Sequence, residues 1–103
     1  MATVFWTVDA RDDLQSVHAY IAEDAPERAE SFIEEIIDST NRLAEFPLIG
    51  RSVPEFNVPW LRQLVHGNYR ILYEPRGVDV WILAVIHGAR DIASMSDRRN
   101  WRR

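Results

Sequence analysis

The sequence predicts an α+β fold in which a helical hairpin packs on one face of an antiparallel sheet. Residues 10–45 carry apolar side chains at helical spacing, and residues 60–87 are dense in β-branched and aromatic residues. The first eight residues have the composition of a further strand. The expected order is therefore β-α-α-β-β-β, in a single domain over residues 1–103 with one modest core.

The first strand is expected within residues 2–8, and its alternate apolar side chains nominate a core face: Val4, Trp6 and Val8. Asp9 is then expected to cap a helix over about residues 10–23, because a carboxylate accepts the free N–H groups of the first turn. The buried stripe of this helix is predicted from its helical spacing to comprise Ala10, Leu14, Val17 and Ile21.

A second helix is expected over about residues 26–45. Pro26 suits a first turn but not a helix interior, so the chain breaks before it and restarts there. Only two or three residues connect the two helices, and a connection this short predicts an antiparallel helical hairpin. Acidic residues occupy the outer surface, and the predicted buried stripe comprises Ala29, Phe32, Ile33, Ile36, Ile37, Thr40 and Leu43.

A proline-rich connection over residues 46–59 leads to three strands, at about 60–66, 69–74 and 79–87. Gly67-Asn68 is a two-residue hairpin loop, which predicts that His66 faces Tyr69 and Val65 faces Arg70. With Pro75-Arg76-Gly77-Val78 as the second turn, Glu74 faces Asp79 and Arg70 faces Leu83.

This register sorts the strand residues onto two faces. The face assigned to the helices is apolar at nine of eleven positions and contains Trp60, Arg62, Leu64, His66, Tyr69, Ile71, Tyr73, Val80, Ile82, Ala84 and Ile86. The second face is apolar at six of eleven and contains Leu61, Gln63, Val65, Arg70, Leu72, Glu74, Asp79, Trp81, Leu83, Val85 and His87. Its apolar middle and charged margin are typical of a surface that meets a partner.

Charge is unevenly distributed along the chain, whose net charge is −4. Residues 1–45 hold eleven acidic side chains and three arginines, whereas residues 46–103 hold five acidic side chains and nine arginines. There is no lysine, so each basic side chain other than histidine is an arginine, whose planar guanidinium group is suited to bidentate contacts with carboxylate or phosphate. The absence of cysteine excludes disulfides, thiolate catalysis and Cys-ligated zinc. We expect a cytoplasmic protein without a signal peptide, membrane span, cofactor or metal.

Several short strings, spread over nearly the whole chain, are similar in identity and order to the RelE/ParE superfamily of bacterial toxins. They are Asp12-Asp13-Leu14, Tyr20-Ile21-Ala22, Phe46-Pro47, Gly50-Arg51, Val53-Pro54-Glu55, Arg62-Gln63-Leu64, Tyr69-Arg70-Ile71-Leu72-Tyr73 and Val85-Ile86-His87-Gly88-Ala89-Arg90. The resemblance implies the toxin of a type II toxin–antitoxin system. It also implies a ParD-like antitoxin partner with a ribbon-helix-helix start and an acidic tail.

A disordered acidic tail fits the second face, where it would place an amphipathic helix or an added strand. Arginines at the margin would take its carboxylates. The alternative is that the chain's own C-terminal segment, basic and aromatic from Gly88 to Arg103, covers this face. The residues expected to bind the antitoxin are Leu61, Arg62, Arg70, Leu72, Trp81, Leu83 and Arg90.

The resemblance covers two functional classes. ParE-like members bind and inhibit DNA gyrase without a catalytic set, and RelE-like members cleave mRNA on the ribosome. Cleavage needs a base for the 2′-hydroxyl, cations for the phosphate and an acid for the leaving oxygen. The residues that match those roles are Glu55, Arg70 and His87, with Arg62 and Arg90 as further phosphate donors.

The ParE-like function is favoured, with the RelE-like endoribonuclease as the alternative and a homologue without toxicity as a third possibility. Against cleavage, the chain has no lysine, is acidic overall and has no tyrosine at its C-terminus. The predicted register also separates His87 from the partner of Arg70 by four residues, about 13 Å at roughly 3.4 Å per residue.

Overall fold

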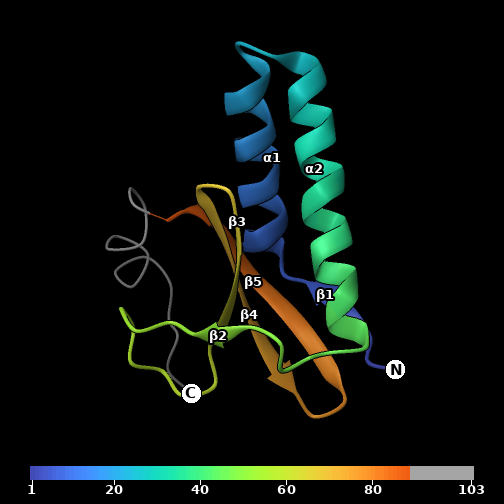
Figure 1. Cartoon of the computed structure of the whole chain (residues 1–103), viewed down its shortest axis with the longest axis vertical. Helices are drawn as coiled ribbons and strands as arrows, with labels where there is room; N and C mark the ends of the chain where they lie inside the picture. The colour runs from blue at the N-terminus through green and yellow to red at the C-terminus, as the bar shows by residue number, and fades with distance from the viewer. Residues whose placement is uncertain (89–103) are drawn as a thin grey trace.

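The computed structural model describes residues 1–88, in which two helices pack against a five-stranded sheet (Figure 1). The helices run antiparallel and side by side, and their connected ends extend beyond the sheet (Figure 1). The elements are β1 (Val4–Trp6), α1 (Val8–Ala22), α2 (Pro26–Asn41), the 3₁₀ turn η1 (Arg42–Ala44), β2 (Arg51–Ser52), β3 (Arg62–His66), β4 (Tyr69–Arg76) and β5 (Asp79–His87). The α+β class and the helical hairpin on one face are confirmed.

The sheet is mixed, with strand order β1-β5-β4-β3-β2. The expectation of a purely antiparallel sheet is wrong at β1, which pairs parallel with β5 so that Val4 lies opposite Val80. β5 is an interior strand that is apolar on both faces, so both faces need cover from water. Its backbone N–H and C=O groups are paired at both edges by neighbouring strands. β4 supplies one neighbour and β1 the other. The short edge strand β2, which pairs with β3, was not predicted.

Helix α1 begins earlier than predicted, because Thr7 rather than Asp9 is its N-cap. The Thr7 hydroxyl oxygen accepts the N–H of Ala10 at 3.1 Å. Val8 is thereby drawn into the first turn and is 65% exposed, so its assignment to a core face is wrong. Pro26 opens α2 as predicted, and the end of the predicted second helix is the 3₁₀ turn η1.

Helices and sheet enclose the principal core. Ile71, Tyr73, Val80 and Ile82 face the helices as predicted, and Leu64 packs against the same cluster. Core side chains from α1, α2 and η1 are Ala10, Val17, Phe32, Ile36 and Leu43.

The β3–β4 register is as predicted, with His66 opposite Tyr69 and Val65 opposite Arg70. The β4–β5 register differs from the prediction. Gly77-Val78 forms the loop, with Gly77 at φ 60°, so that Arg76 rather than Glu74 lies opposite Asp79. The ladder then shifts at Leu72/Tyr73.

Because Tyr73 pairs with Ile82 whereas Leu72 pairs with Ala84, Leu83 is the extra residue of this irregularity. Because of this extra residue, the side chains that follow Leu83 lie on the faces opposite to those predicted. Val85 packs in the helix-side core, and Ala84 and Ile86 pack on the second face, the reverse of the prediction.

The second face of the sheet is covered by the chain's own connection between β2 and β3. Val53 is buried there, and Phe56, Val58 and Trp60 pack over the same cluster. Leu61 and Leu72 are fully buried beneath this cover, so the expectation that they lie on an open partner-binding face is wrong. Among the apolar residues expected to bind the antitoxin, Trp81 and Leu83 keep partial exposure.

Candidate functional site

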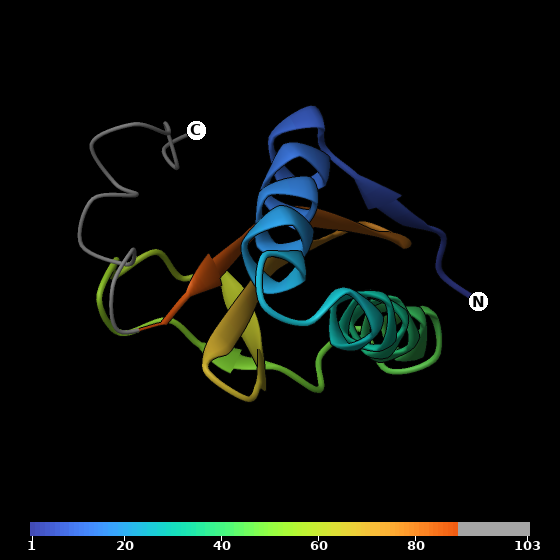
Figure 2. The ribbon, with the colours of Figure 1, turned by 90° about the horizontal axis from the view of Figure 1, so that it is seen from above.

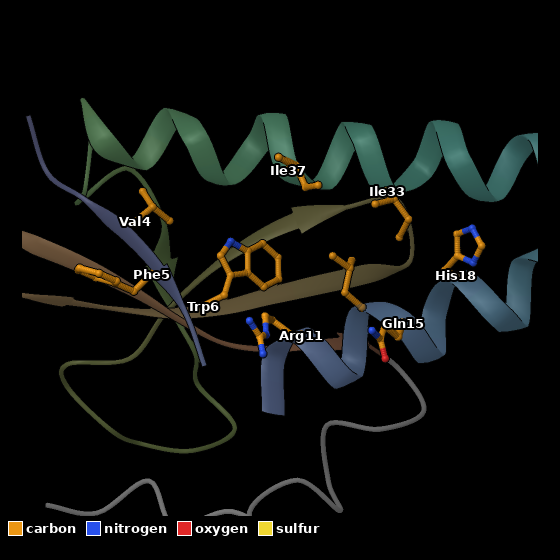
Figure 3. A pocket seen from close by; sticks show the side chains of 9 residues that line it. Val4, Phe5, Trp6, Arg11, Gln15, His18, Ile33 and Ile37 are labelled. Carbon is orange, nitrogen blue, oxygen red and sulfur yellow. The ribbon is translucent and has the colours of Figure 1, made fainter. Parts of the chain in front are cut away.

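A groove opens where β1, α1 and α2 meet, and we call it the β1–helix groove (Figure 3). Its volume is about 680 Å³. Trp6 lies between the two helices, and Ile33 and Ile37 point towards it from α2 (Figure 3). The residues that line the groove are Val4, Phe5, Trp6, Arg11, Leu14, Gln15, His18, Ile33 and Ile37.

The sequence analysis assigned Ile33 and Ile37 to the core, but the hairpin leaves them open to the groove. Ile37 is 40% exposed, and Ile33 is half-buried. The signal that could have revealed the groove is the width of the predicted α2 stripe, which has more apolar positions than one packed helix face needs. The polar rim of the groove comes from α1, where His18 contacts Glu30 at 3.0 Å.

The groove runs beside the open edge of β1. The N–H of Val80 donates to the Thr3 carbonyl, and the N–H of Thr7 donates to the Ile82 carbonyl. In a parallel ladder this pattern turns the backbone N–H and C=O groups of Val4 and Trp6 away from β5, towards the sheet edge. A strand edge bordered by an apolar groove is a template for an added extended segment.

On the other face of the same edge, three side chains form a layered cluster. The rings of Phe5 and Trp81 stack with centroids 4.7 Å apart, and the Arg76 guanidinium lies 5.3 Å from the Trp81 centroid. The buried carboxylate of Glu74 holds Arg76 at 2.8 Å. Phe5 is 38% exposed, so the cluster presents aromatic surface beside β1.

The residues matched to RNA cleavage are only partly brought together. Arg70 donates to Glu55 at 3.0 Å, and this bond holds the pKa of the Glu55 carboxyl below its usual value. Glu55 is therefore a weaker base, and the charge of Arg70 is already matched by a carboxylate.

His87 lies nearer to Arg70 than predicted, because the true register pairs Arg70 with Ile86. The expected separation of about 13 Å along the strand, at roughly 3.4 Å per residue, is wrong. Arg70 and His87 both line a shallow hollow of about 250 Å³ at the end of the sheet. Strand alternation nevertheless places Arg70 on the face of Ile86 and His87 on the face of Tyr69.

The remaining predicted site residues have different surroundings. Arg62 donates to the backbone carbonyls of Leu48 and Gly50 at 3.2 and 2.8 Å. Arg90 lies outside the described residues, as does most of the C-terminal segment. Within residues 1–88, no three His, Asp or Glu side chains are grouped to hold a metal ion. Neither α1 nor α2 is long and apolar enough to cross a bilayer.

Residues 4–92 match the family described as the ParE toxin of the type II toxin–antitoxin system parDE. The chain belongs to this family and is thus the toxin component of such a system. The predicted resemblance to the RelE/ParE superfamily, and to its ParE-like branch, is confirmed.

The fold is also similar to a solved chain described as the chromosomal ParDE toxin–antitoxin system from P. aeruginosa. The TM-score is 0.73 at 22% sequence identity, over 84% of this chain and 96% of that one. No curated protein matches the sequence.

Proposed function

We propose that this toxin acts in the cytoplasm by binding and inhibiting DNA gyrase, without catalysis of its own. Membership of the ParE toxin family supports this function. The observation that carries the absence of catalysis is the ion pair between Arg70 and Glu55. A phosphate would have to displace Glu55 from the arginine best placed to hold it, and His87 stands on the opposite face of the sheet end.

We further propose that the antitoxin binds along β1. An extended segment added to this edge would meet the outward backbone groups of Val4 and Trp6. Side chains on one side of the segment would enter the β1–helix groove, and those on the other would contact the Phe5–Trp81 stack. Arg11 is exposed at the groove, which favours an acidic segment.

This proposal moves the antitoxin surface from the middle of the second face to the edge of the sheet. Trp81 remains in it through its stack with Phe5, whereas Leu83 packs in the cluster under the β2–β3 connection. Leu61 and Leu72 are excluded because they are buried, and Arg62 and Arg70 because their guanidinium groups already bind within the chain.

The test of gyrase inhibition is a supercoiling assay with purified gyrase, relaxed plasmid DNA and increasing amounts of the full-length toxin. We expect supercoiling to fall in the presence of the toxin and to recover when the antitoxin is added. The Arg70→Ala variant should inhibit gyrase as well as the native toxin does, because Arg70 has no catalytic role in this proposal. Intact supercoiling at saturating toxin would disprove gyrase inhibition.

The second candidate function is ribosome-dependent mRNA cleavage. It is favoured by one observation, that Arg70 and His87 border the same hollow. The toxin would then cut mRNA in a translating extract, and Arg70→Ala would abolish the cuts while gyrase supercoiling stayed intact throughout. That combination would replace gyrase inhibition as the function.

A further inference from the structure

The loop between η1 and β2 exposes three large apolar side chains. In this segment, which we call the 46–49 loop, Phe46 is 55% exposed, Leu48 63% and Ile49 46%. The loop leads from the end of the helical hairpin to β2, at the sheet edge opposite β1 (Figure 2). None of its residues lines the β1–helix groove.

The backbone of this loop is held by side chains from the sheet. The Tyr73 hydroxyl donates to the Pro47 carbonyl at 2.9 Å and accepts the N–H of Gly50 at 2.8 Å. Arg62 donates to the carbonyls of Leu48 and Gly50. Gly50 permits the close approach, since a Cβ there would lie 2.5 Å from the Tyr73 hydroxyl oxygen. The buried side chain of Tyr73 thus fixes a loop whose own side chains point outward.

A fixed backbone and exposed apolar side chains together favour protein binding. Ordering a mobile loop on association opposes binding, and a loop already held in place avoids that loss. Exposed apolar side chains that are scattered singly need no explanation, but three on one short fixed loop form an anchor suited to a pocket.

The charges beside the loop indicate the kind of pocket. Two of the three exposed charges that flank the loop are positive: Arg42 precedes it on η1, and Arg51 follows it on β2. The third, Glu45, lies directly before Phe46. Within residues 1–88, neither arginine is within ion-pair distance of a carboxylate. A complementary surface would have an apolar centre for Leu48 and Ile49 and an acidic rim for the two arginines.

We propose that the 46–49 loop is the anchor by which the toxin binds its protein target, and that the target presents an apolar pocket with an acidic rim. This inference rests on the proposed function, in which the target is gyrase. It assigns target and antitoxin to different surfaces of the toxin.

The test compares the Leu48→Ser/Ile49→Ser variant with the native full-length toxin in the supercoiling assay. Val78→Ser is the matched control, because Val78 is 81% exposed on the β4–β5 loop. We expect the double variant to need at least about tenfold more toxin for half-inhibition, and the control to behave as the native toxin does. Both variants should keep the native melting temperature, since the replaced side chains are exposed.

A charge-reversed variant, Arg42→Glu/Arg51→Glu, examines the acidic rim. We expect weaker inhibition at low salt and a smaller difference from the native toxin at high salt, because screening reduces exposed charge interactions. If this variant inhibits gyrase as well as the native toxin does at low salt, the inference that the target pocket has an acidic rim is wrong.

The other outcomes are distinct. Native inhibition by the Leu48→Ser/Ile49→Ser variant would overturn the anchor and leave gyrase inhibition standing. A native toxin without effect on gyrase would reject the proposed function first, and the anchor with it. A native dimer that this double variant converts to a monomer would show that the loop joins two copies of the chain, which also overturns the proposal.

Discussion

Tyr69 lies directly opposite His87 across β4 and β5, with ring centroids 5.5 Å apart and ring planes at 81°. Phe32 of α2 also contacts Tyr69, with a distance of 5.2 Å between the two ring centroids. His87 therefore extends an aromatic cluster at the junction of the sheet and the helical hairpin. A structural role for this histidine follows from those contacts.

The His87→Ala variant should lose stability and keep its inhibition of gyrase. Removing an edge-to-face aromatic partner should lower the free energy of unfolding by about 0.5–1.5 kcal/mol. Urea denaturation would measure this change, with His87→Phe expected to restore most of it. A variant that unfolds like the native protein but no longer acts in cells would instead indicate that His87 takes part in chemistry.

The Tyr73→Phe variant should destabilise the protein, because it leaves the N–H of Gly50 and the carbonyl of Pro47 without their shared partner. The expected loss is about 1–3 kcal/mol in the free energy of unfolding. Burial raises the pKa of the Tyr73 hydroxyl, so it remains protonated and able to donate near neutral pH. Val78→Ala, at an 81% exposed position on the β4–β5 loop, is the control for urea denaturation and should change little.

The carboxyl group of Glu35 should make the stability of the fold fall as the pH is lowered below 4.5. Hydrogen bonding to His66, followed by the contacts of Arg28, lowers the pKa of this carboxyl from 4.5. A lowered folded-state pKa stabilises the fold above pH 4.5, and that contribution is lost as pH falls through the folded value.

The Glu35→Gln variant should therefore melt at a lower temperature than the native protein at pH 7. The difference should shrink as the pH is lowered below 4.5, which melting curves over a pH series would show. Glu34→Gln, a neighbouring exposed position, is the control. A difference that stays constant with pH would mean that the carboxylate charge is not what stabilises this contact.

The Ile37→Glu variant should bind the antitoxin at least about tenfold more weakly, since it places a carboxylate in the apolar wall of the β1–helix groove. Ile37 is 40% exposed, so the fold should tolerate the change. Titration calorimetry with the antitoxin would measure the affinity, with Tyr20→Glu on the outer side of α1 as control. Equal affinities for the two variants would place the antitoxin elsewhere.

Local patterns predicted the helices and the β3–β4 hairpin because each depends on neighbouring residues. Pro26 restarts the chain as a helix, and Gly67 at φ 58° closes a two-residue loop. The β4–β5 register was missed because Pro75-Arg76-Gly77-Val78 admits two loop lengths. The irregularity at Leu83 was also hidden, since β5 is apolar on both parities and accepts either face.

The candidate site was less predictable than the fold. Ile33 and Ile37 have the spacing of core residues, but they line the β1–helix groove. The burial of Leu61 and Leu72 depends on a proline-rich connection whose apolar residues have neither helical nor strand spacing, so its packing on the sheet was not predictable. Contacts between distant segments decided both points, and a single sequence does not display them.

The pairing of β1 with β5 makes folding depend on the order of synthesis. Val4 leaves the ribosome long before Val80, its partner in the ladder. Until β5 emerges, the first strand has no hydrogen-bonded neighbour, and the helices lack Val80, Ile82 and Val85 to pack against. A message broken before the codons of β5 would therefore yield a chain without the strand that joins β1 to β4, so the cell encounters a folded toxin only after translation has passed that point.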